Sequence, residues 1–285
     1  MSDDGETALV IIAMLGHPFS PYYAAARRRA AADPLDYVAM NVALYRRDRS
    51  KWALTERRSP YRSRDALAIG TSSMEWRGDA LEIRVDERTS PLPSRLRGVV
   101  TVRPKGLTGE PLALDAAGAH LWWPIAPRSR VEVAFDEPGL RFSGNAYLDS
   151  NTGDQPLEEA FRSWSWSRLS SRDKTLVSYH VERNDKTRGK TDLLFDGGMC
   201  GLEAGVSTPL PGTRWGLPRT AHGPKGVRLE LAQTLEDTPF YSRSRIAASL
   251  GGERLEGVHE GLDLQRFTRP WVQALIPFRM RRQGA

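Results

Sequence analysis

Hydrophobic and polar residues alternate along most of this chain. Leu81, Ile83 and Val85 are separated by polar residues, and the same spacing recurs over residues 131–135 and 227–231. In an extended strand this period of two places the apolar side chains on one face, so we expect half-buried antiparallel strands. Clusters of proline, glycine, aspartate and asparagine separate further predicted strands, which cover residues 9–15, 37–44, 98–102, 176–181 and 192–195. The pattern therefore predicts an all-β protein.

Two short segments break this alternation and are predicted to be helices. Residues 21–32 begin with proline and are rich in alanine and arginine. Residues 156–164 follow Asp154, a residue type that caps helix N-termini, and carry Glu158 and Glu159 in the predicted first turn. Because each helix is short, we expect it to plug or flank a sheet.

A faint internal repeat indicates two related β-domains. Gly139–Gly144 (GLRFSG) is similar to Gly252–Gly257 (GERLEG), and a carboxylate follows each stretch within a few residues. A chain with this many strands closes more easily into two barrels than into one wide sheet. We therefore predict a boundary near residue 160, with a domain of residues 1–160 that carries the candidate site and a second domain of residues 161–285.

The composition is that of an ordinary folded protein. Of 285 residues, 40% are hydrophobic and 27% charged, which excludes the disordered, collagen-like and disulfide-scaffold classes. The 41 lysines and arginines exceed the 35 aspartates and glutamates, a mild excess that suits an acidic surface without requiring nucleic acid. Cys200 is the single cysteine, so no internal disulfide can form and a reducing compartment such as the cytoplasm is expected.

No segment is predicted to cross a membrane. The longest apolar run, residues 8–15, is too short to span a bilayer. Acidic residues precede it, whereas a signal peptide begins with basic ones, so the run is not expected to direct secretion. We therefore expect a soluble or peripherally bound protein.

Candidate chemistry is concentrated in residues 119–168, where four of the eight tryptophans lie. His120 and Trp122 are two positions apart and so share a face of an extended strand, as do Tyr147 and Asp149. Two such strands predict an inward-facing pocket that combines an imidazole, an indole, a phenol and a carboxyl group. The alternative is that these residues fill the core or, for Asp149, begin a turn, because titratable groups mark functional sites only statistically.

Other chemistries have weaker signals. Asp149–Asp154 is similar to the start of a calcium loop, but its glycine and aspartate are in reversed order and Ala160 occupies the twelfth position, so no calcium site is predicted. The five histidines are scattered without metal-ligand spacing. Neither a G-x-S-x-G motif nor a glycine-rich phosphate loop is present, which leaves little support for a zinc enzyme, a serine hydrolase or a nucleotide enzyme.

Several motifs together resemble those of the carotenoid 1,2-hydratases, also called hydroxyneurosporene synthases. They are Ser20–Tyr23, Asn41–Tyr45, Trp52–Arg57, His120–Trp122, Tyr147–Gly153, Pro156–Phe161 and Trp164–Arg168. The resemblance runs from about Leu15 to the C-terminus, and His17 is a departure from it. It implies an all-β fold of two lipocalin-like barrels with one or two short helices. It also implies a cofactor-independent and metal-independent enzyme that adds water across the terminal C1–C2 double bond of an acyclic carotenoid such as neurosporene or lycopene.

The resemblance assigns the pocket to His120, Trp122, Tyr147 and Asp149. Asp149 would protonate C2, which requires an apolar pocket to raise its pKa by about three units, on the order of 4 kcal/mol. The face of Trp122 would stabilise the resulting cation by roughly 2 kcal/mol. His120 would orient the water and accept its proton, and the hydroxyl of Tyr147 would hold the water or Asp149.

The implied substrate also predicts where the protein works. A forty-carbon polyene is insoluble, so its enzyme must meet it at a bilayer, where arginines contribute about 1 kcal/mol each near an anionic leaflet. Residues 27–29 and 279–282 are basic runs, and the apolar residues near them are Tyr22, Tyr23, Trp271 and Phe278. We expect peripheral binding at the cytoplasmic side of the inner or intracytoplasmic membrane of a photosynthetic bacterium. Otherwise these runs are solvated faces; nucleic-acid binding is not predicted, because no stacking platform or known motif accompanies them.

Two alternatives remain open at the level of sequence. The same barrel and aromatic lining would suit a non-catalytic lipid carrier, because a fold alone does not define a function. They would also suit another cofactor-free cation enzyme, such as a cyclase. A buried Asp149 and His120 favour an enzyme over a carrier, since an apolar lining would avoid the free energy of burying both polar groups.

Overall fold

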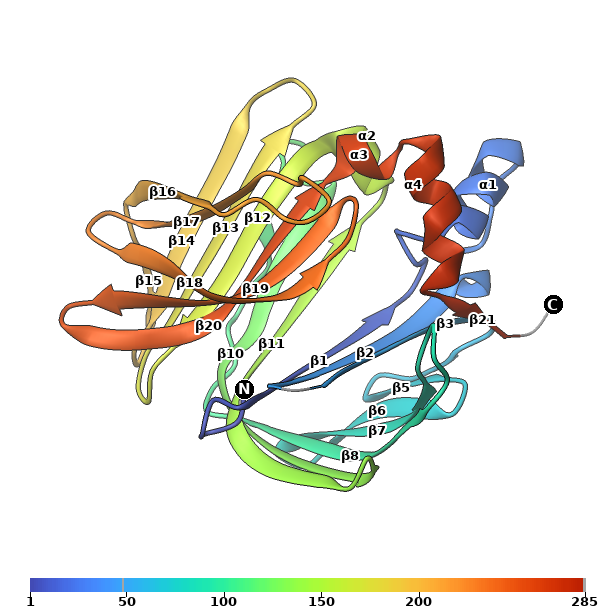
Figure 1. Cartoon of the computed structure of the whole chain (residues 1–285), viewed down its shortest axis with the longest axis horizontal. Helices are drawn as coiled ribbons and strands as arrows, with labels where there is room; N and C mark the ends of the chain where they lie inside the picture. Colours follow the sequence, from blue (N-terminus) through green and yellow to red (C-terminus); the bar gives the residue numbers. More distant parts are fainter. Residues whose placement is uncertain (48, 284–285) are drawn as a thin grey trace. The chain divides into compact units, whose positions relative to one another are not determined.

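The computed structural model describes residues 1–47 and 49–283, and antiparallel strands make up most of it (Figure 1). The all-β prediction is confirmed, and every strand predicted from alternation overlaps an observed strand. Within the described residues no helix is both long and apolar enough to cross a membrane. The short helical segments are α1 (Pro21–Arg29), α2 (Leu157–Ala160), α3 (Leu264–Phe267), α4 (Pro270–Leu275) and the 3-10 turns η1 (Pro34–Asp36) and η2 (Ile276–Phe278).

The chain forms two compact units that are interleaved in sequence. The first unit contains Met1–Gly106, Ser129–Tyr147 and the segment from Gln273 onwards, and the second contains Leu107–Arg128 and Leu148–Val272. This division differs from the predicted boundary near residue 160. The difference arises because β10 (His120–Glu137, 18 residues) and β11 (Leu140–Gly153, 14 residues) are much longer than an average strand, so that each contributes residues to both units.

The first unit contains two sheets. One has the order β1-β2-β3-β21, and the other has the order β11-β10-β8-β7-β6-β5-β4. The alternation seen in the sequence appears in β7, where buried and more exposed residues alternate over most of the strand. The strands of this unit that have not yet been placed are β1 (Thr7–Met14), β2 (Val38–Arg46), β3 (Ser50–Arg57), β4 (Tyr61–Arg62), β5 (Ala66–Ile69), β6 (Ser72–Arg77), β7 (Ala80–Arg88), β8 (Arg95–Pro104) and β21 (Arg281–Arg282).

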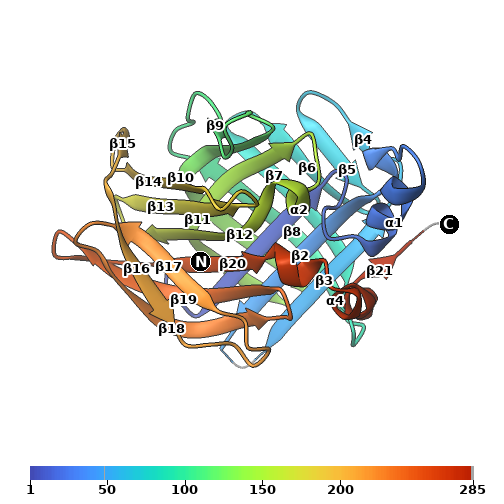
Figure 2. The same cartoon turned by 90° about the horizontal axis from the view of Figure 1, so that it is seen from above.

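The second unit contains a seven-stranded sheet and a separate hairpin that packs on it (Figure 2). The sheet order is β15-β14-β13-β12-β20-β19-β18, the hairpin is β16–β17, and the short β9 pairs with β10. The strands are β9 (Leu112–Ala113), β12 (Phe161–Ser170), β13 (Thr175–Arg183), β14 (Arg188–Phe195), β15 (Met199–Gly201), β16 (Ala204–Leu210), β17 (Arg219–Pro224), β18 (Arg228–Asp237), β19 (Tyr241–Leu250) and β20 (Glu253–Asp263).

Both predicted helices exist but are shorter than expected. The first ends at Arg29, and Ser20 caps it by accepting a hydrogen bond from the amide of Tyr23. The prediction of a helix over residues 156–164 is wrong beyond Ala160, where β12 begins. The reason is that Trp164 and Trp166 alternate with serines, a strand pattern that prevails over the acidic helix-start signal.

The face of the seven-stranded sheet under the hairpin has an apolar part and a polar part. The apolar part is a buried core of leucine, isoleucine, valine and alanine side chains. Beside it, strand register aligns five buried residues, which we call the polar row: Asp192, Ser178, Ser167, His259 and Ser244. Among the described residues, no hydrogen-bond partner is present for the hydroxyls of Ser167 and Ser178, for Oδ1 of Asp192 or for Nδ1 of His259. The polar row is therefore an interior surface that hydrogen bonds within the protein satisfy only in part.

Burial makes the stability of the protein dependent on pH. Burial lowers the pKa of His259 to about 4, and it lowers the pKa of His17 to about 3. Since an unfolded histidine titrates near 6.5, the unfolded state binds more protons below that pH, so stability is lost as pH falls from about 6.5 towards 4. We expect the urea concentration at the unfolding midpoint of the wild type to decrease as the pH is lowered from 7 to 5. The free energy of unfolding of His259→Gln should decrease by about 2 kcal/mol less than that of the wild type over this range. Equal losses in variant and wild type would contradict this assignment.

Candidate active site

A hydrogen bond joins two of the predicted site residues, Trp122 and Asp149. Trp122 lies on β10, and its Nε1 donates a hydrogen bond of 3.0 Å to Oδ2 of Asp149 on β11. The indole is completely buried, with 0% exposure, and Asp149 is half-buried. The N–H group orients the carboxyl group and stabilises negative charge on Oδ2. The structure therefore provides a carboxyl group held by a buried donor.

Tyr179 of β13 packs against this pair. Its ring lies edge-on to Trp122, with centroids 5.3 Å apart and an interplanar angle of 76°, and edge-on to Trp164 at 6.2 Å. Its hydroxyl donates to Oδ1 of Asn151 at 3.3 Å. Burial raises the pKa of Tyr179, and the negative charges of Asp149 and Glu260 raise it further, so the phenol keeps its proton at physiological pH.

His120 lies in the same unit but holds other partners. Its Nδ1 is 3.0 Å from Oδ2 of Asp115, and its Nε2 is 3.1 Å from the carbonyl oxygen of Gln155. Burial raises the pKa of Asp115, but hydrogen bonds from the Ala119 amide and from His120 outweigh it, so the pKa lies below its usual value. His120 therefore ties the loop before β10 to the segment after β11.

Gly153 is required for this arrangement of His120. A Cβ atom at position 153 would lie 2.6 Å from Cδ2 of the imidazole, a distance that real Cβ atoms do not reach. The close approach explains a glycine at the last position of β11. The alternative in which Asp149 begins a turn is wrong, since the strand continues through Gly153.

Tyr147 is half-buried and is the last β11 residue of the first unit, two positions before Asp149. The candidates that the second unit contains are thus His120, Trp122 and Asp149, of which Trp122 and Asp149 are hydrogen-bonded to each other.

The sequence did not identify Tyr179, which packs on Trp122, or the residues that follow it across the sheet. Tyr179, Trp166, Glu260 and Arg243 occupy adjacent positions across β13, β12, β20 and β19, on the sheet face opposite the polar row. Nε of Arg243, which is almost fully buried, donates to Oε1 of Glu260 at 2.8 Å. The alternation of tryptophan and serine in β12 predicted an aromatic face. The residues that lie beside this face on neighbouring strands depend on strand register, which no local sequence pattern indicates.

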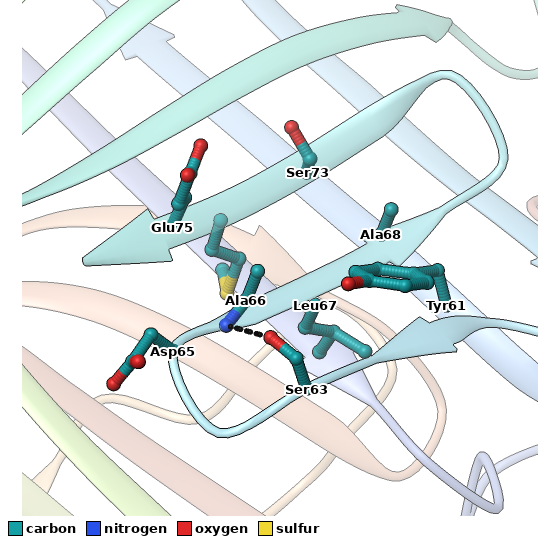
Figure 3. Close-up of a pocket in the computed structure, with 9 residues that line it drawn as sticks. Tyr61, Ser63, Asp65, Ala66, Leu67, Ala68, Ser73 and Glu75 are labelled. Atoms are coloured by element: carbon teal, nitrogen blue, oxygen red, sulfur yellow. Dashed lines mark hydrogen bonds between the residues drawn. The ribbon is translucent and has the colours of Figure 1, made fainter. Parts of the chain in front are cut away.

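We also searched the described residues for a metal site and for a surface pocket. Over residues 1–47 and 49–283, no three His, Cys, Asp or Glu side chains are grouped so that they could hold a metal ion. A pocket of about 420 Å³ lies along β4, β5 and β6, where the amide of Ala66 donates to Ser63 (Figure 3). None of the four predicted site residues lines it.

Solved structures that resemble this chain share its fold at low sequence identity. A putative AttH protein from Nitrosomonas europaea superposes with a TM-score of 0.61 at 14% identity, covering 79% of this chain and 80% of its own. CghA in complex with Sch210972 superposes with a TM-score of 0.51 at 11% identity, with the same coverage of 79% and 80%. These similarities agree with the predicted lipocalin-like architecture.

Sequence relatives are closer. Acyclic carotenoid 1,2-hydratase from Thiocapsa roseopersicina is 45% identical over 292 residues, which cover 100% of this chain and 71% of the relative. The protein of the same name from Rubrivivax gelatinosus is 44% identical, covering 100% and 72%. The one from Cereibacter sphaeroides is 33% identical, covering 96% and 98%. The model of the family described as carotenoid hydratase CrtC matches residues 11–285. This chain therefore belongs to the carotenoid hydratase CrtC family.

Proposed function

We propose that this chain adds water across the terminal C1–C2 double bond of an acyclic carotenoid such as lycopene, with Asp149 as the acid. The observation that carries the proposal is the hydrogen bond from the buried Trp122 to the carboxyl group of Asp149. Family membership supports the reaction class. Adding water to an alkene requires no electron transfer, so we propose that the chain's own side chains suffice without a cofactor.

Asp149 starts the reaction by transferring its proton to C2. The electron pair of the double bond forms the new C–H bond, and C1 becomes a tertiary cation. As the proton leaves, negative charge develops on the carboxyl group, and the N–H group of Trp122 is already in place to stabilise it. This assigns to Trp122 a role at the carboxylate, whereas the sequence led us to expect that its ring face would meet the cation.

The same carboxylate can close the cycle. Water forms the C–O bond at C1, and one of its protons moves to Asp149, which restores the acid. This route does not need His120 as the base, and the two ring nitrogens of His120 already have Asp115 and Gln155 as partners. We therefore assign His120 to holding the loops beside the site, in place of the predicted general base.

Asp149→Asn should abolish hydration, because the amide has no acidic proton to give. We expect the rate to fall by about 10²–10⁴ while carotenoid binding persists. The measurement is mass spectrometry of carotenoids after incubation of purified protein with lycopene in ¹⁸O-labelled water. Asp154→Asn is the matched control, since Asp154 is exposed. Near wild-type turnover in Asp149→Asn would remove Asp149 from the donor role, and binding by the wild type without ¹⁸O uptake would identify a carrier.

Trp122→Phe should slow the reaction by roughly ten- to hundredfold with little change in KM, because it removes a hydrogen bond to a charged group that strengthens as the proton leaves. Trp123→Phe is the control: it also removes an indole hydrogen bond, but that bond goes to the hydroxyl of Thr108 at 3.1 Å. Steady-state kinetics of both variants test this role. Equal effects of the two substitutions would show that Trp122 does not act on Asp149.

The first unit also carries a surface that we propose binds an anionic bilayer, from which the substrate is drawn. Leu92 is 83% exposed and Phe278 is 71% exposed, and Ser90 donates to the carbonyl oxygen of Phe278 at 3.2 Å, so the two apolar side chains lie on neighbouring loops. An arginine accompanies them: the guanidinium of Arg279 lies 4.7 Å from the ring centroid of Trp52. Exposed apolar side chains next to a positively charged side chain are suited to the interface of an anionic membrane.

This surface revises the predicted membrane residues. Tyr22 is partly exposed beneath Arg282, whose guanidinium lies 4.5 Å from its ring centroid. Tyr23 instead stacks on Tyr37 at 4.8 Å within the first unit. Trp271 belongs to the second unit and stacks on Trp215. We propose a peripheral location on the cytoplasmic side of the inner or intracytoplasmic membrane, with Leu92 and Phe278 as the inserting residues.

The double variant Leu92→Ser and Phe278→Ser should bind phosphatidylglycerol-containing vesicles roughly tenfold or more weakly than wild type, because it removes two apolar groups that would leave water. Co-sedimentation with such vesicles, and with pure phosphatidylcholine vesicles, provides the measurement. Leu107→Ser serves as the control, since Leu107 is a similarly exposed apolar residue of the second unit. Unchanged binding of the double variant, or equal binding of wild type to both vesicles, would refute the proposed surface.

A further inference from the structure

Hydration requires a group that orients the attacking water. In the second unit, the predicted residues His120 and Trp122 already have other hydrogen-bond partners. To bind water, His120 would have to give up its contact with Asp115 or with Gln155. The N–H group of Trp122 is directed to Asp149 and can only donate. A water molecule that attacks a cation presents its lone pair to carbon, so its two hydrogens need acceptors.

Tyr179 is placed to be one of these acceptors. Its side chain is almost fully buried, at 4% exposure, and two indole rings, Trp122 and Trp164, hold its ring edge-on. Because the Tyr179 hydroxyl donates its hydrogen to Oδ1 of Asn151, the lone pairs of its oxygen are directed elsewhere. Asn151 follows Asp149 by two positions on β11, so the two side chains share a face of the strand.

The charges around Tyr179 suit a hydroxyl that accepts without ionising. Asp149 and Glu260 act electrostatically on the phenol, and with burial they keep its proton in place. Glu260 is itself held by Arg243, with 2.8 Å between Nε and Oε1. A phenol that stays neutral offers a hydrogen-bond acceptor and does not compete with Asp149 for the proton of water.

We propose that Tyr179 is a positioning residue whose hydroxyl accepts one hydrogen bond from the attacking water while the carboxylate of Asp149 accepts the other. The oxygen lone pair then faces C1. Asp149 gives its proton to C2, water forms the C–O bond, and the proton that water loses returns to Asp149; Tyr179 keeps its own proton throughout. This inference rests on the proposed hydration and names the group that controls its second half.

A purely structural Tyr179 would behave differently from a water-positioning one. The ring contacts with Trp122 and Trp164 survive in Tyr179→Phe, so a packing role would be preserved. The hydroxyl is lost, so capture of the cation by water should slow while its formation continues. A cation that water does not capture returns to an alkene by losing a proton from C2 or from a methyl group on C1. In D₂O this return leaves deuterium in the recovered carotenoid.

The test is therefore incubation of lycopene with Tyr179→Phe in D₂O, followed by mass spectrometry of both the hydrate and the recovered carotenoid. We expect hydrate formation to fall about tenfold, the loss that corresponds to one neutral hydrogen bond. Deuterium incorporation into recovered lycopene should persist, so the ratio of exchange to hydration rises about tenfold. Tyr61→Phe, a change at an exposed tyrosine of the first unit, should leave the ratio unchanged.

Asn151→Ala provides a second variant, because Asn151 is exposed and its loss frees the Tyr179 hydroxyl to rotate. It should shift the ratio in the same direction by a smaller amount, and it carries the test if Tyr179→Phe does not fold. Hydration and exchange falling in parallel, or an unchanged ratio, would overturn the role of Tyr179. A wild type that forms no hydrate would refute the proposed function instead.

Discussion

The hydrogen bond between Trp122 and Asp149 is the interaction on which the proposed chemistry depends. It joins neighbouring strands of the second unit and fixes one oxygen of a carboxyl group against a completely buried donor. The indole is in turn held by the ring of Tyr179. A carboxyl group with a fixed orientation is what proton transfer to an unactivated alkene requires.

The surrounding sheet face combines aromatic rings with paired charges. Burying the ion pair of Arg243 and Glu260 carries a desolvation penalty that hydrogen bonding only partly offsets. A face built only to bind a hydrocarbon would have no reason to include it. Negative charge near a reaction that passes through a cation lowers the energy of that cation, so the ionised Asp149 favours the intermediate, whereas Arg243 largely neutralises the charge of Glu260. The electrostatics of this face therefore suit cation chemistry better than passive carriage.

Local patterns in the sequence predicted the strands, and the family motifs predicted the reaction, but the partners of each side chain depended on strand register. Alternation placed His120 and Trp122 on one strand, and both are buried. It did not indicate that Asp115, in the preceding loop, would form a hydrogen bond with Nδ1 of His120. Tyr179 reaches Trp122 across strands that are distant in sequence, a contact that no local spacing encodes. The interleaved units were also unpredictable, because a single boundary in the sequence cannot describe a hairpin whose two strands are both divided between the units.

The polar row has a consequence for where a hydrocarbon can enter the second unit. The hydroxyls of Ser167 and Ser178, Oδ1 of Asp192 and Nδ1 of His259 have no hydrogen-bond partner among the described residues. A polyene laid along the hairpin side of the sheet would offer these groups no hydrogen bond, at a free energy of roughly 1–3 kcal/mol for each. The polar row therefore disfavours an apolar ligand on the hairpin side of the sheet. The opposite, tryptophan-rich side is the route that a long apolar chain can take.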